Sequence, residues 1–478
     1  MARESSIWPD LSGPRSFVQA IREIRAERGR PLPPSPKGLP LVGSFVDLQR
    51  DVLKMIEQGR QEFGDTIYFR FGPLGLTVIH KPETIRQVLL ERDADFGRSP
   101  TYAGMRLVLG NGLLTSEGEF WKRQRKLMTP SFHYKRLRGF GDTMVRCASE
   151  LADEWDAHVR RSPNEPLDVH EAMLALTLRI VGLTLFSTEL SEHAGPMGPA
   201  LETVVEHANH VAVSLLLAPP PWVPTPRNRR FLAAKAIVDE LVYGIISRRR
   251  ETSEDPGDLL GMLMAATGED SGERMSDTEL RDEVATLVLA GHETTAQALT
   301  WTMMLLSQHP AVEARVVEEL ARVCGARQPT LDDLKALTYT GWVIDEALRL
   351  YPPAWLFERQ ARTAVEIEGY SYREGSLLAV SPWSLHRHPR YWPNPEGFDP
   401  ERFSPERSAK RPRYTYLPFG GGPRQCIGIN FALYEAKLVL ATLMQRYSLE
   451  LVPSQNLRPR AEITLRPPEG MKMWLRPR

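Results

Sequence analysis

Four glycines and two prolines surround a single thiol in the segment Pro418-Phe419-Gly420-Gly421-Gly422-Pro423-Arg424-Gln425-Cys426-Ile427-Gly428. Glycines permit backbone conformations that side chains forbid, and they let a chain approach a flat ligand closely. A helix-like pattern begins at Ile429, so Cys426 is expected near a helix N-terminus, where the partial positive charge and the free N–H groups lower the pKa of a thiol. The segment therefore predicts a loop that presents a thiolate to a bulky ligand.

Three roles for Cys426 are open on local grounds: an inert buried residue, a catalytic nucleophile and a metal ligand. A nucleophile needs a positioned base, which no local motif supplies, although a distant histidine would serve. A zinc site needs several nitrogen or sulfur ligands, and Cys147 and Cys324 show no paired spacing with Cys426. A haem iron needs only one axial protein ligand, so haem ligation is the favoured interpretation.

The same segment matches the pattern Phe-x-x-Gly-x-Arg-x-Cys-x-Gly, and here the chain resembles the cytochrome P450 family. The resemblance covers nearly the whole chain from about Pro36 onward. It implies haem b as the cofactor, with Cys426 as its metal ligand and O2 as the co-substrate. It also implies that these residues of the segment contact the haem: Pro418, Phe419, Gly420, Arg424, Ile427 and Gly428.

The whole chain has the composition of an ordinary globular protein, with 478 residues, 42% hydrophobic and 25% charged. No linker or repeat interrupts it after the first forty residues, so we expect one large catalytic unit at residues 36–478 behind an extension at residues 1–35. The 60 basic and 60 acidic residues cancel, which argues against nucleic acid as a partner. Three cysteines without paired spacing fit a reducing compartment, so a cytoplasmic protein is expected.

Helical periodicity dominates residues 136–350 and the stretch after Cys426, whereas strand-like runs are short and occur at residues 67–79 and 365–380. This pattern predicts a mainly α architecture with a minor β region. It agrees with the cytochrome P450 fold that the resemblance implies, as a single large haem-binding unit. One helix is expected over residues 330–351, with a capped start at Thr330 and a stop at Pro352.

The N-terminal extension carries no apolar span of roughly 20 residues that would cross a bilayer. Residues 14–30 place their apolar side chains on one helical face among arginines. Such a helix lies on a membrane surface or packs on its own domain, and its shortness favours the second arrangement. The proline-rich connector at residues 31–40 is similar to that of membrane-associated cytochromes P450, without their anchor. Peripheral membrane contact thus stays open as an alternative.

Glu346 and Arg349 stand three residues apart in a helical stretch, where positions i and i+3 share a face. Alone, this spacing indicates no more than a solvated surface ion pair. Arg402, however, lies 24 residues before Cys426, where the cytochrome P450 pattern has its second arginine. The resemblance implies a structural network of Glu346, Arg349 and Arg402 that fixes the loop carrying the haem ligand, a task that suits a planar guanidinium which remains charged.

Residues 283–296 have helical periodicity but place Gly291, Glu293 and Thr294 among apolar residues, a costly insertion unless it is used. A zinc-protease motif does not fit, because its second histidine would stand at Ala296. The plain alternative is a threonine bonded back to its own helix. The resemblance instead makes Ala290-Gly291-x-Glu293-Thr294 the oxygen-binding groove beside the haem. Gly291 would leave room for dioxygen at a local widening of the helix, Thr294 would hydrogen-bond the dioxygen, and Glu293 would relay protons.

Trp121 and Arg125 follow the family's Trp-x-x-x-Arg pattern on a helix beside the haem propionates. Arg359 is a third candidate for the same role, with Arg362 as its alternative. By themselves these residues indicate only surface contacts. The basic stretch from Lys122 to Arg138 is expected to flank the proximal side of the haem, where an acidic ferredoxin or flavodoxin would deliver electrons. The chain shows no flavin or iron–sulfur segment, so the NAD(P)H-dependent reductase is expected to be separate.

The resemblance implies a haem-thiolate monooxygenase that hydroxylates or epoxidises an apolar organic substrate and acts as a monomer. A peroxide-dependent haem peroxygenase is a second hypothesis, although such relatives often lack the pair Glu293-Thr294, and a non-catalytic haem-binding sensor is a third. Fatty acid, terpenoid and polyketide-like substrates all stay open, with Arg106 as an anchor for a substrate carboxylate or as an ordinary surface residue. The expected substrate pocket consists of Met105, Leu107, Val108, Val211, Leu215, Leu287, Ala290, Trp355, Leu356, Phe357, Ile463 and Thr464.

Overall fold

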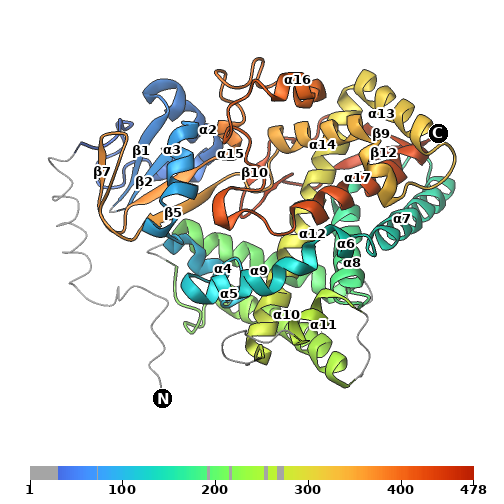
Figure 1. Cartoon of the computed structure of the whole chain (residues 1–478), viewed down its shortest axis with the longest axis horizontal. Helices are drawn as coiled ribbons and strands as arrows, with labels where there is room; N and C mark the ends of the chain where they lie inside the picture. Colours follow the sequence, from blue (N-terminus) through green and yellow to red (C-terminus); the bar gives the residue numbers. More distant parts are fainter. Residues whose placement is uncertain (1–30, 73, 191–193, 215–217, 252–256, 266–273) are drawn as a thin grey trace.

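The structure is a computed structural model, and it describes residues 31–478 except 73, 191–193, 215–217, 252–256 and 266–273. The helix expected at residues 14–30 therefore lies outside the described residues. A small region rich in strands occupies one side of the molecule, and a larger helical region that carries the C-terminus occupies the other (Figure 1). None of the described helices is both long enough and apolar enough to cross a lipid bilayer.

Helices make up most of the described chain, which confirms the mainly α fold class. The longer helices are α2 (Phe45–Phe63), α5 (Gly118–Met128), α7 (Gly141–Arg161), α8 (Val169–Leu185), α9 (Ala194–Ser214), α10 (Pro226–Glu251), α12 (Asp277–Gln308), α13 (Pro310–Val323), α14 (Thr338–Leu350) and α17 (Ile429–Arg446). The shorter ones are α3 (Pro82–Arg86), α4 (Ala103–Leu109), α6 (Tyr134–Leu137), α11 (Leu259–Ala265), α15 (Pro382–Leu385) and α16 (Pro405–Ser408). Short 3₁₀ or π segments include η1 (Gln87–Glu91), η3 (Pro100–Tyr102), η6 (Leu331–Lys335), η7 (Pro400–Phe403) and η8 (Gly422–Arg424).

The largest sheet joins the two strand-like stretches that the sequence predicts. Its five strands have the order β1-β2-β8-β5-β3, with β1 (Thr66–Phe71), β2 (Leu74–Ile79), β3 (Phe96–Gly97), β5 (Phe357–Ala361) and β8 (Leu377–Val380). β2 pairs antiparallel with β1 and parallel with β8, so residues far apart in the sequence are neighbours in one sheet. The remaining strands form small sheets: β4 (Leu167–Asp168), β6 (Val365–Ile367), β7 (Tyr370–Tyr372), β9 (Tyr447–Leu451), β10 (Arg460–Ala461), β11 (Leu465–Arg466) and β12 (Lys472–Pro477).

Helix α12 runs through the centre of the helical region and is buried on nearly all sides (Figure 1). Its start is fixed by a capping box, in which the Ser276 side chain accepts from the Glu279 N–H and the Glu279 carboxylate accepts from the Ser276 N–H. Helices α8, α10, α14 and α17 pack around it. A helix enclosed in this way has no solvent face, which explains why apolar residues occur on every side of its sequence.

The single helix expected over residues 330–351 is wrong. Thr330 does form a capping box with Asp333, but this box starts the short 3₁₀ segment η6 and not the helix. Leu337 then takes a non-helical conformation, and α14 begins at Thr338. The Glu319 carboxylate, which projects from α13, accepts the N–H groups of Tyr339 and Thr340 at 2.8 Å each. The helix therefore starts where a neighbouring helix caps it, a contact that no local pattern reveals.

Helices α9 and α10 pack against each other, and α9 also packs against α4. Val211 lies in the last turn of α9, which ends at Ser214, and the prolines at 219–221 lie beyond that end. Trp222 follows them with 81% of its surface exposed.

Candidate active site

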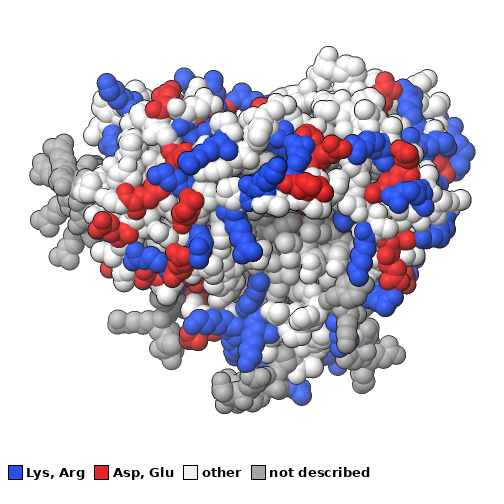
Figure 2. Space-filling model, turned by 45° about the horizontal axis from the view of Figure 1, so that its top comes forward, with Lys and Arg blue, Asp and Glu red and all other residues white. Residues whose placement is uncertain are grey.

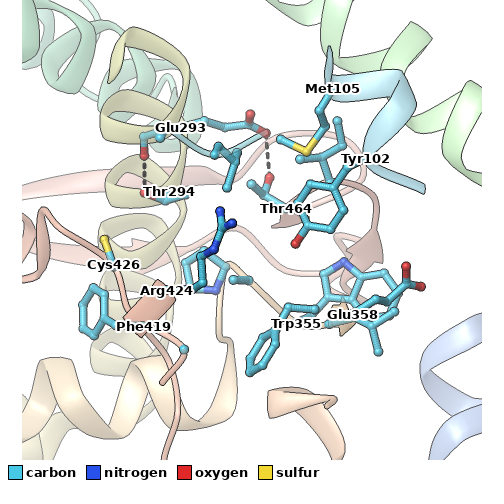
Figure 3. Close-up of a pocket in the computed structure, with 18 of the residues that line it drawn as sticks. Tyr102, Met105, Glu293, Thr294, Trp355, Glu358, Phe419, Arg424, Cys426 and Thr464 are labelled. Atoms are coloured by element: carbon cyan, nitrogen blue, oxygen red, sulfur yellow. Dashed lines mark hydrogen bonds between the residues drawn. The ribbon is translucent and has the colours of Figure 1, made fainter. Parts of the chain in front are cut away.

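A largely apolar cavity of about 530 Å³ lies between α12, the sheet and the start of α17. Its wall combines residues from α4, α9, β5, the thiol-bearing segment 418–428 and the loop that joins β10 to β11. Segments that are hundreds of residues apart thus meet around one space, with Cys426 on one side and Thr464 on another (Figure 3).

Cys426 lies on the wall of this cavity in a tight turn. Its N–H donates to the carbonyl of Phe419 at 3.0 Å, and the Gln425 N–H donates to the carbonyl of Gly422 at 3.1 Å. Helix α17 begins at Ile429, so the thiol of Cys426 lies just before a helix N-terminus, as the sequence predicts. The exposed surface of Cys426 belongs to the cavity wall. The turn therefore presents the sulfur to a ligand inside the protein.

Glycine is required in this turn for steric reasons. Gly422 has a φ of +70°, and a Cβ at that position would lie 1.8 Å from the carbonyl oxygen of Leu89 in η1. Gly420 has a φ of +67° and lines the cavity. Both angles lie in the region that L-residues with side chains rarely adopt. The glycines thus let the loop fold back against η1 while it faces the cavity.

The structure corrects the expected pKa of Cys426. Burial raises the pKa of this thiol above its ordinary value, although the Gly428 N–H and the charge of Arg125 both act to lower it. The helix N-terminus is thus present, but desolvation outweighs it. A metal cation at the sulfur would reverse this balance, because a coordinating thiol is deprotonated outright.

Glu346, Arg349 and Arg402 form one buried network. The Glu346 carboxylate accepts from Arg349 Nε at 2.7 Å and Nη2 at 2.8 Å, and from Arg402 Nε at 3.1 Å. Both Glu346 and Arg349 are 0% exposed. The remaining guanidinium N–H groups donate to backbone carbonyls of residues 386–397. The solvated ion pair that the spacing alone indicates is therefore ruled out, and the network clamps the chain before the thiol-bearing segment.

His386 connects this network to the thiol-bearing segment. Its carbonyl accepts from Arg349 Nη1 at 2.9 Å, and its ring Nε2 accepts from the Leu417 N–H at 2.8 Å. Burial lowers the pKa of His386 well below its ordinary value, and the charge of Arg349 adds to that effect. The ring is therefore neutral, which leaves Nε2 free to accept. Leu417 directly precedes Pro418, so a short chain of hydrogen bonds joins Glu346 to the loop of Cys426.

Glu293 and Thr294 lie on the part of α12 that borders the cavity. Thr294 Oγ1 donates to the carbonyl of Ala290 at 2.7 Å, which is the plain bond back to its own helix, and the side chain still faces the cavity. The expected local widening is not observed, since α12 is one uninterrupted α-helix through this region. A Cβ on Gly291 would lie 3.0 Å from Val181, so glycine also serves the close packing of α12 on α8.

Four guanidinium groups meet at the side of the cavity near Cys426. Arg98, Arg125, Arg359 and Arg424 all line it, and no ion pair joins any of them to a carboxylate within the described ranges. Burial lowers the pKa of Arg359 to about 10 and that of Arg424 to about 9, and the charge of Arg98 adds to both effects. Arg359 and Arg424 therefore remain protonated near neutral pH.

Such a group of cations on the wall of a largely apolar cavity is costly unless an anion compensates it. Haem b carries two carboxylates beside its flat, apolar ring, and the cavity offers an apolar wall, four cations and one thiol. The residues present therefore fit this cofactor. Trp121 supports the arrangement, because the Arg424 guanidinium stacks 4.0 Å from its ring centre.

Of the two candidates for contact with the haem propionates, Arg359 fits better than Arg362. Arg359 is buried on the cavity wall, whereas Arg362 is 44% exposed and pairs with Glu117 at 3.2 Å. We expect Arg359→Leu to speed the loss of haem to an apo-globin acceptor by about tenfold or more, since a charge-assisted contact contributes at least about 1.5 kcal/mol. Arg362→Leu is the matched control and should leave that rate unchanged. The reverse pattern would assign the role to Arg362.

Most of the expected pocket residues line the cavity, and three do not. Those that line it are Met105, Leu287, Ala290, Trp355, Leu356, Phe357, Ile463 and Thr464. Leu107 and Val108 belong to α4, as Met105 does, but they do not line the cavity and pack against the main core instead. Val211 is buried next to Ala212 and Val213, which take its expected place on the wall. For these three residues the expected helical face is wrong. Leu215 lies outside the described residues.

The sequence reasoning missed Arg98 and Tyr102. No motif marks them, because an arginine before Ser-Pro has no anion-binding signature of its own. The pairing of β3 with β5 sets Gly97 opposite Gln360, which brings Arg98 next to Arg359. Arg98 Nη1 donates to the Tyr102 hydroxyl at 3.3 Å, while its Nε is buried without a partner. The register of two short strands would have been the only signal.

Comparisons with known proteins agree with this geometry. The sequence profile of the family described as "Cytochrome P450" matches residues 33–474. "Cyclooctatin synthase" of Streptomyces melanosporofaciens is 38% identical over 435 residues, which cover 90% of this chain and 93% of that protein. "Pentalenene oxygenase" of Streptomyces avermitilis is 34% identical over 445 residues, covering 92% and 96%. The crystal structure of the cytochrome P450DA heme domain superposes with a TM-score of 0.85 at 30% identity, covering 94% of this chain and 99% of that one. The chain therefore belongs to the cytochrome P450 family and is a monooxygenase.

Proposed function

We propose that this cytochrome P450 inserts one atom of O2 into a neutral, polycyclic hydrocarbon of the terpene type, by hydroxylation or epoxidation. The wall of the cavity carries the argument. Its only cations among the described residues are the four arginines on the side near Cys426. Arg106 does not line the cavity, and its guanidinium donates to the carbonyl of Thr115 at 2.6 Å. A fatty acid would bury a carboxylate without a partner, which is strongly unfavourable.

The shape of the wall supports a compact substrate. Trp355 places a large ring on one side, and Met105 and Tyr102 face it from the region of α4 (Figure 3). Phe357 adds a second ring to the cavity wall. The Trp355 indole N–H donates to the carbonyl of Glu462 at 2.6 Å, so this ring is fixed in place. Fixed aromatic walls favour rigid apolar ring systems over long flexible chains. One relative is by name an oxygenase of pentalenene, a polycyclic terpene hydrocarbon, which supports the same class.

Each part of the site then has a task. Cys426 would ligate the iron, while Arg98, Arg125, Arg359 and Arg424 would bind the two haem carboxylates. Haem held by a cysteine thiolate supplies oxygen activation, because electron donation by the sulfur favours cleavage of the O–O bond. Thr294 presents a hydroxyl to the cavity, and the neighbouring Glu293 supplies protons to it. The apolar wall excludes bulk water and orients the substrate.

Electrons would come from a separate ferredoxin or flavodoxin. The space-filling view shows a hollow on one face of the molecule (Figure 2). Lys and Arg side chains surround it, with Asp and Glu side chains between them. Within the predicted basic stretch, Lys122, Arg123 and Arg138 pair with Glu119, Glu279 and Asp332 respectively. These pairs make the stretch less positive than its sequence indicates. We therefore expect the basic stretch to raise the rate of encounter with the electron donor more than the affinity for it.

Turnover tests the reaction type. The haem-loaded protein, supplied with electrons by a ferredoxin and its NAD(P)H-dependent reductase, should convert a polycyclic terpene hydrocarbon to a product that contains one oxygen atom from ¹⁸O2. Mass spectrometry of the product gives the origin of that atom. Product with hydrogen peroxide alone, and none with O2 and electrons, would make the protein a peroxygenase. No product under either condition would contradict an oxygenase of this substrate class.

Binding tests the substrate class separately. In a spectral titration of the haem-loaded protein, a neutral polycyclic terpene should bind at least about tenfold more tightly than a fatty acid of the same carbon number, because one unpaired carboxylate costs more than about 1.4 kcal/mol. The methyl ester of that fatty acid is the matched control for charge, and it should recover part of the affinity. Tighter binding of the free acid would refute the neutral-substrate proposal.

A further inference from the structure

The two side chains that serve proton transfer point in different directions. Glu293 and Thr294 are consecutive on α12, so their side chains project about 100° apart. Thr294 bonds to Ala290 on its own helix, whereas the Glu293 carboxylate extends to the loop between β10 and β11 (Figure 3). There Thr464 Oγ1 donates to Glu293 Oε1 at 2.6 Å. In this state the acid is therefore held away from the hydroxyl that it serves.

The hairpin that holds Glu293 has a well-defined position. β10 and β11 pair antiparallel, with Arg460 opposite Arg466. The carbonyl of Leu465 accepts from the Trp301 indole at 3.0 Å, and its N–H donates to the carbonyl of Pro353 at 3.0 Å. Because Trp301 projects from α12 itself, the hairpin is fixed to the same helix that carries Glu293. The contact between Thr464 and Glu293 is thus part of the fold and not a chance approach of a loose loop.

Ionisable groups connect this contact to the surface. Glu462 is buried, lines the cavity, and pairs with Arg466 and with Arg460 at 2.7 Å each. Arg466 also lies 3.8 Å from Glu202 of α9, whose side chain is 61% exposed. Arg460 is exposed as well. A line of charged groups therefore runs from solvent to the wall of the cavity beside Thr464.

These groups act on the protonation of Glu293. Burial raises the pKa of Glu293 above its ordinary value. The Thr464 hydrogen bond and the charge of Arg466 lower it, while the charges of Glu462 and Glu202 raise it. Arg466 and Glu462 belong to the hairpin, and Glu202 belongs to α9. The hairpin thus sets how readily this acid takes up and releases a proton.

We propose that the hairpin Arg460–Arg466 is the proton-loading position of Glu293, with Thr464 as the positioning residue. The proposal rests on the function proposed above for Glu293 and Thr294. A proton from solvent adds to the Glu293 carboxylate while Thr464 holds it beside the charged groups of the hairpin. Rotation of the side chain then brings the acid to Thr294, whose hydroxyl accepts this proton as its own proton moves into the cavity. No electron moves in this step.

Infrared spectroscopy of the haem-loaded full chain at rest tests the proposal without turnover. The carboxyl C=O band of Glu293 is identified by its absence in Glu293→Gln, and its amplitude against pH gives the pKa. Thr464→Val should raise this pKa by about one, since it removes a hydrogen bond to the charged form. Glu462→Gln should lower the pKa, because it removes a negative charge. Thr464→Ser keeps the hydroxyl and should restore the wild-type value.

The fraction of NAD(P)H electrons recovered in product gives the second measurement. Thr464→Val should lower this fraction severalfold and shift its pH profile in the same direction as the pKa, and Thr464→Ser should restore both. An unchanged band and pKa in Thr464→Val would refute the role of the hairpin while leaving the proposed function intact. Full coupling in Glu293→Gln would instead contradict the proton-relay function itself.

Discussion

Replacing Cys426 with serine should abolish monooxygenase activity and remove the red-shifted absorption of the reduced carbon monoxide complex. Cys426 is the only cysteine on the cavity wall among the described residues, and its turn directs the sulfur into that space. A serine oxygen fits the same turn but does not donate electron density as a thiolate does. The variant should therefore still fold, and it should still take up haem through the arginines.

Cys324→Ser provides the matched control for this experiment. Cys324 is buried just after α13 and does not line the cavity. We expect this variant to keep both activity and the red-shifted absorption. Absorption spectra of the reduced protein with carbon monoxide, together with the turnover assay, provide the comparison. If Cys426→Ser kept the shifted band, thiolate ligation by this residue would be disproved.

Glu346→Ala should have the largest effect on stability. It removes the carboxylate that pairs with Arg349 and Arg402 and leaves two buried guanidinium groups without their anion. The expected cost is about 3 to 5 kcal/mol of unfolding free energy, because a buried charge that loses its partner is not solvated. Since Arg349 and His386 connect this network to Leu417, the variant should also lose haem more readily. Urea unfolding and haem-transfer rates measure the two effects.

An exposed pair with the same spacing provides the control. Glu119 and Lys122 also stand three residues apart and lie 2.7 Å from each other, but both side chains are largely exposed. Glu119→Ala should change the unfolding free energy by no more than about 0.5 kcal/mol. Equal effects of Glu119→Ala and Glu346→Ala would show that the buried network stabilises the protein no more than an exposed ion pair does.

The contrast between these two pairs shows the limit of sequence spacing. Both read as i, i+3 ion pairs, and only the approach of Arg402 and of the carbonyls at 386–397 makes one of them a structural anchor. The resemblance to cytochromes P450 provided that distinction for Glu346. It provided none for His386, which no motif marked although it bonds directly to the residue before Pro418.

Side-chain direction was the least predictable property of the site. Met105, Leu107 and Val108 were all expected on the pocket wall, but successive residues of a helix point about 100° apart, so faces toward the cavity and toward the core occur within one turn. Thr464 was expected only as a wall residue, and its bond to Glu293 joins positions that are 171 residues apart. Such contacts depend on how helices and strands pack, which local periodicity does not encode.

The sequence by itself determined the thiol-bearing loop, the family and the mainly helical fold. These features are local, because glycines at fixed spacing, a helix start and a regular apolar period each act within a few turns of chain. Only the tertiary structure brought four arginines to one cavity wall, buried Arg359 while it left Arg362 exposed, kept Arg106 off that wall and joined Thr464 to Glu293. Each of these follows from the burial of groups brought together from distant segments, and burial sets both their contacts and their charge state.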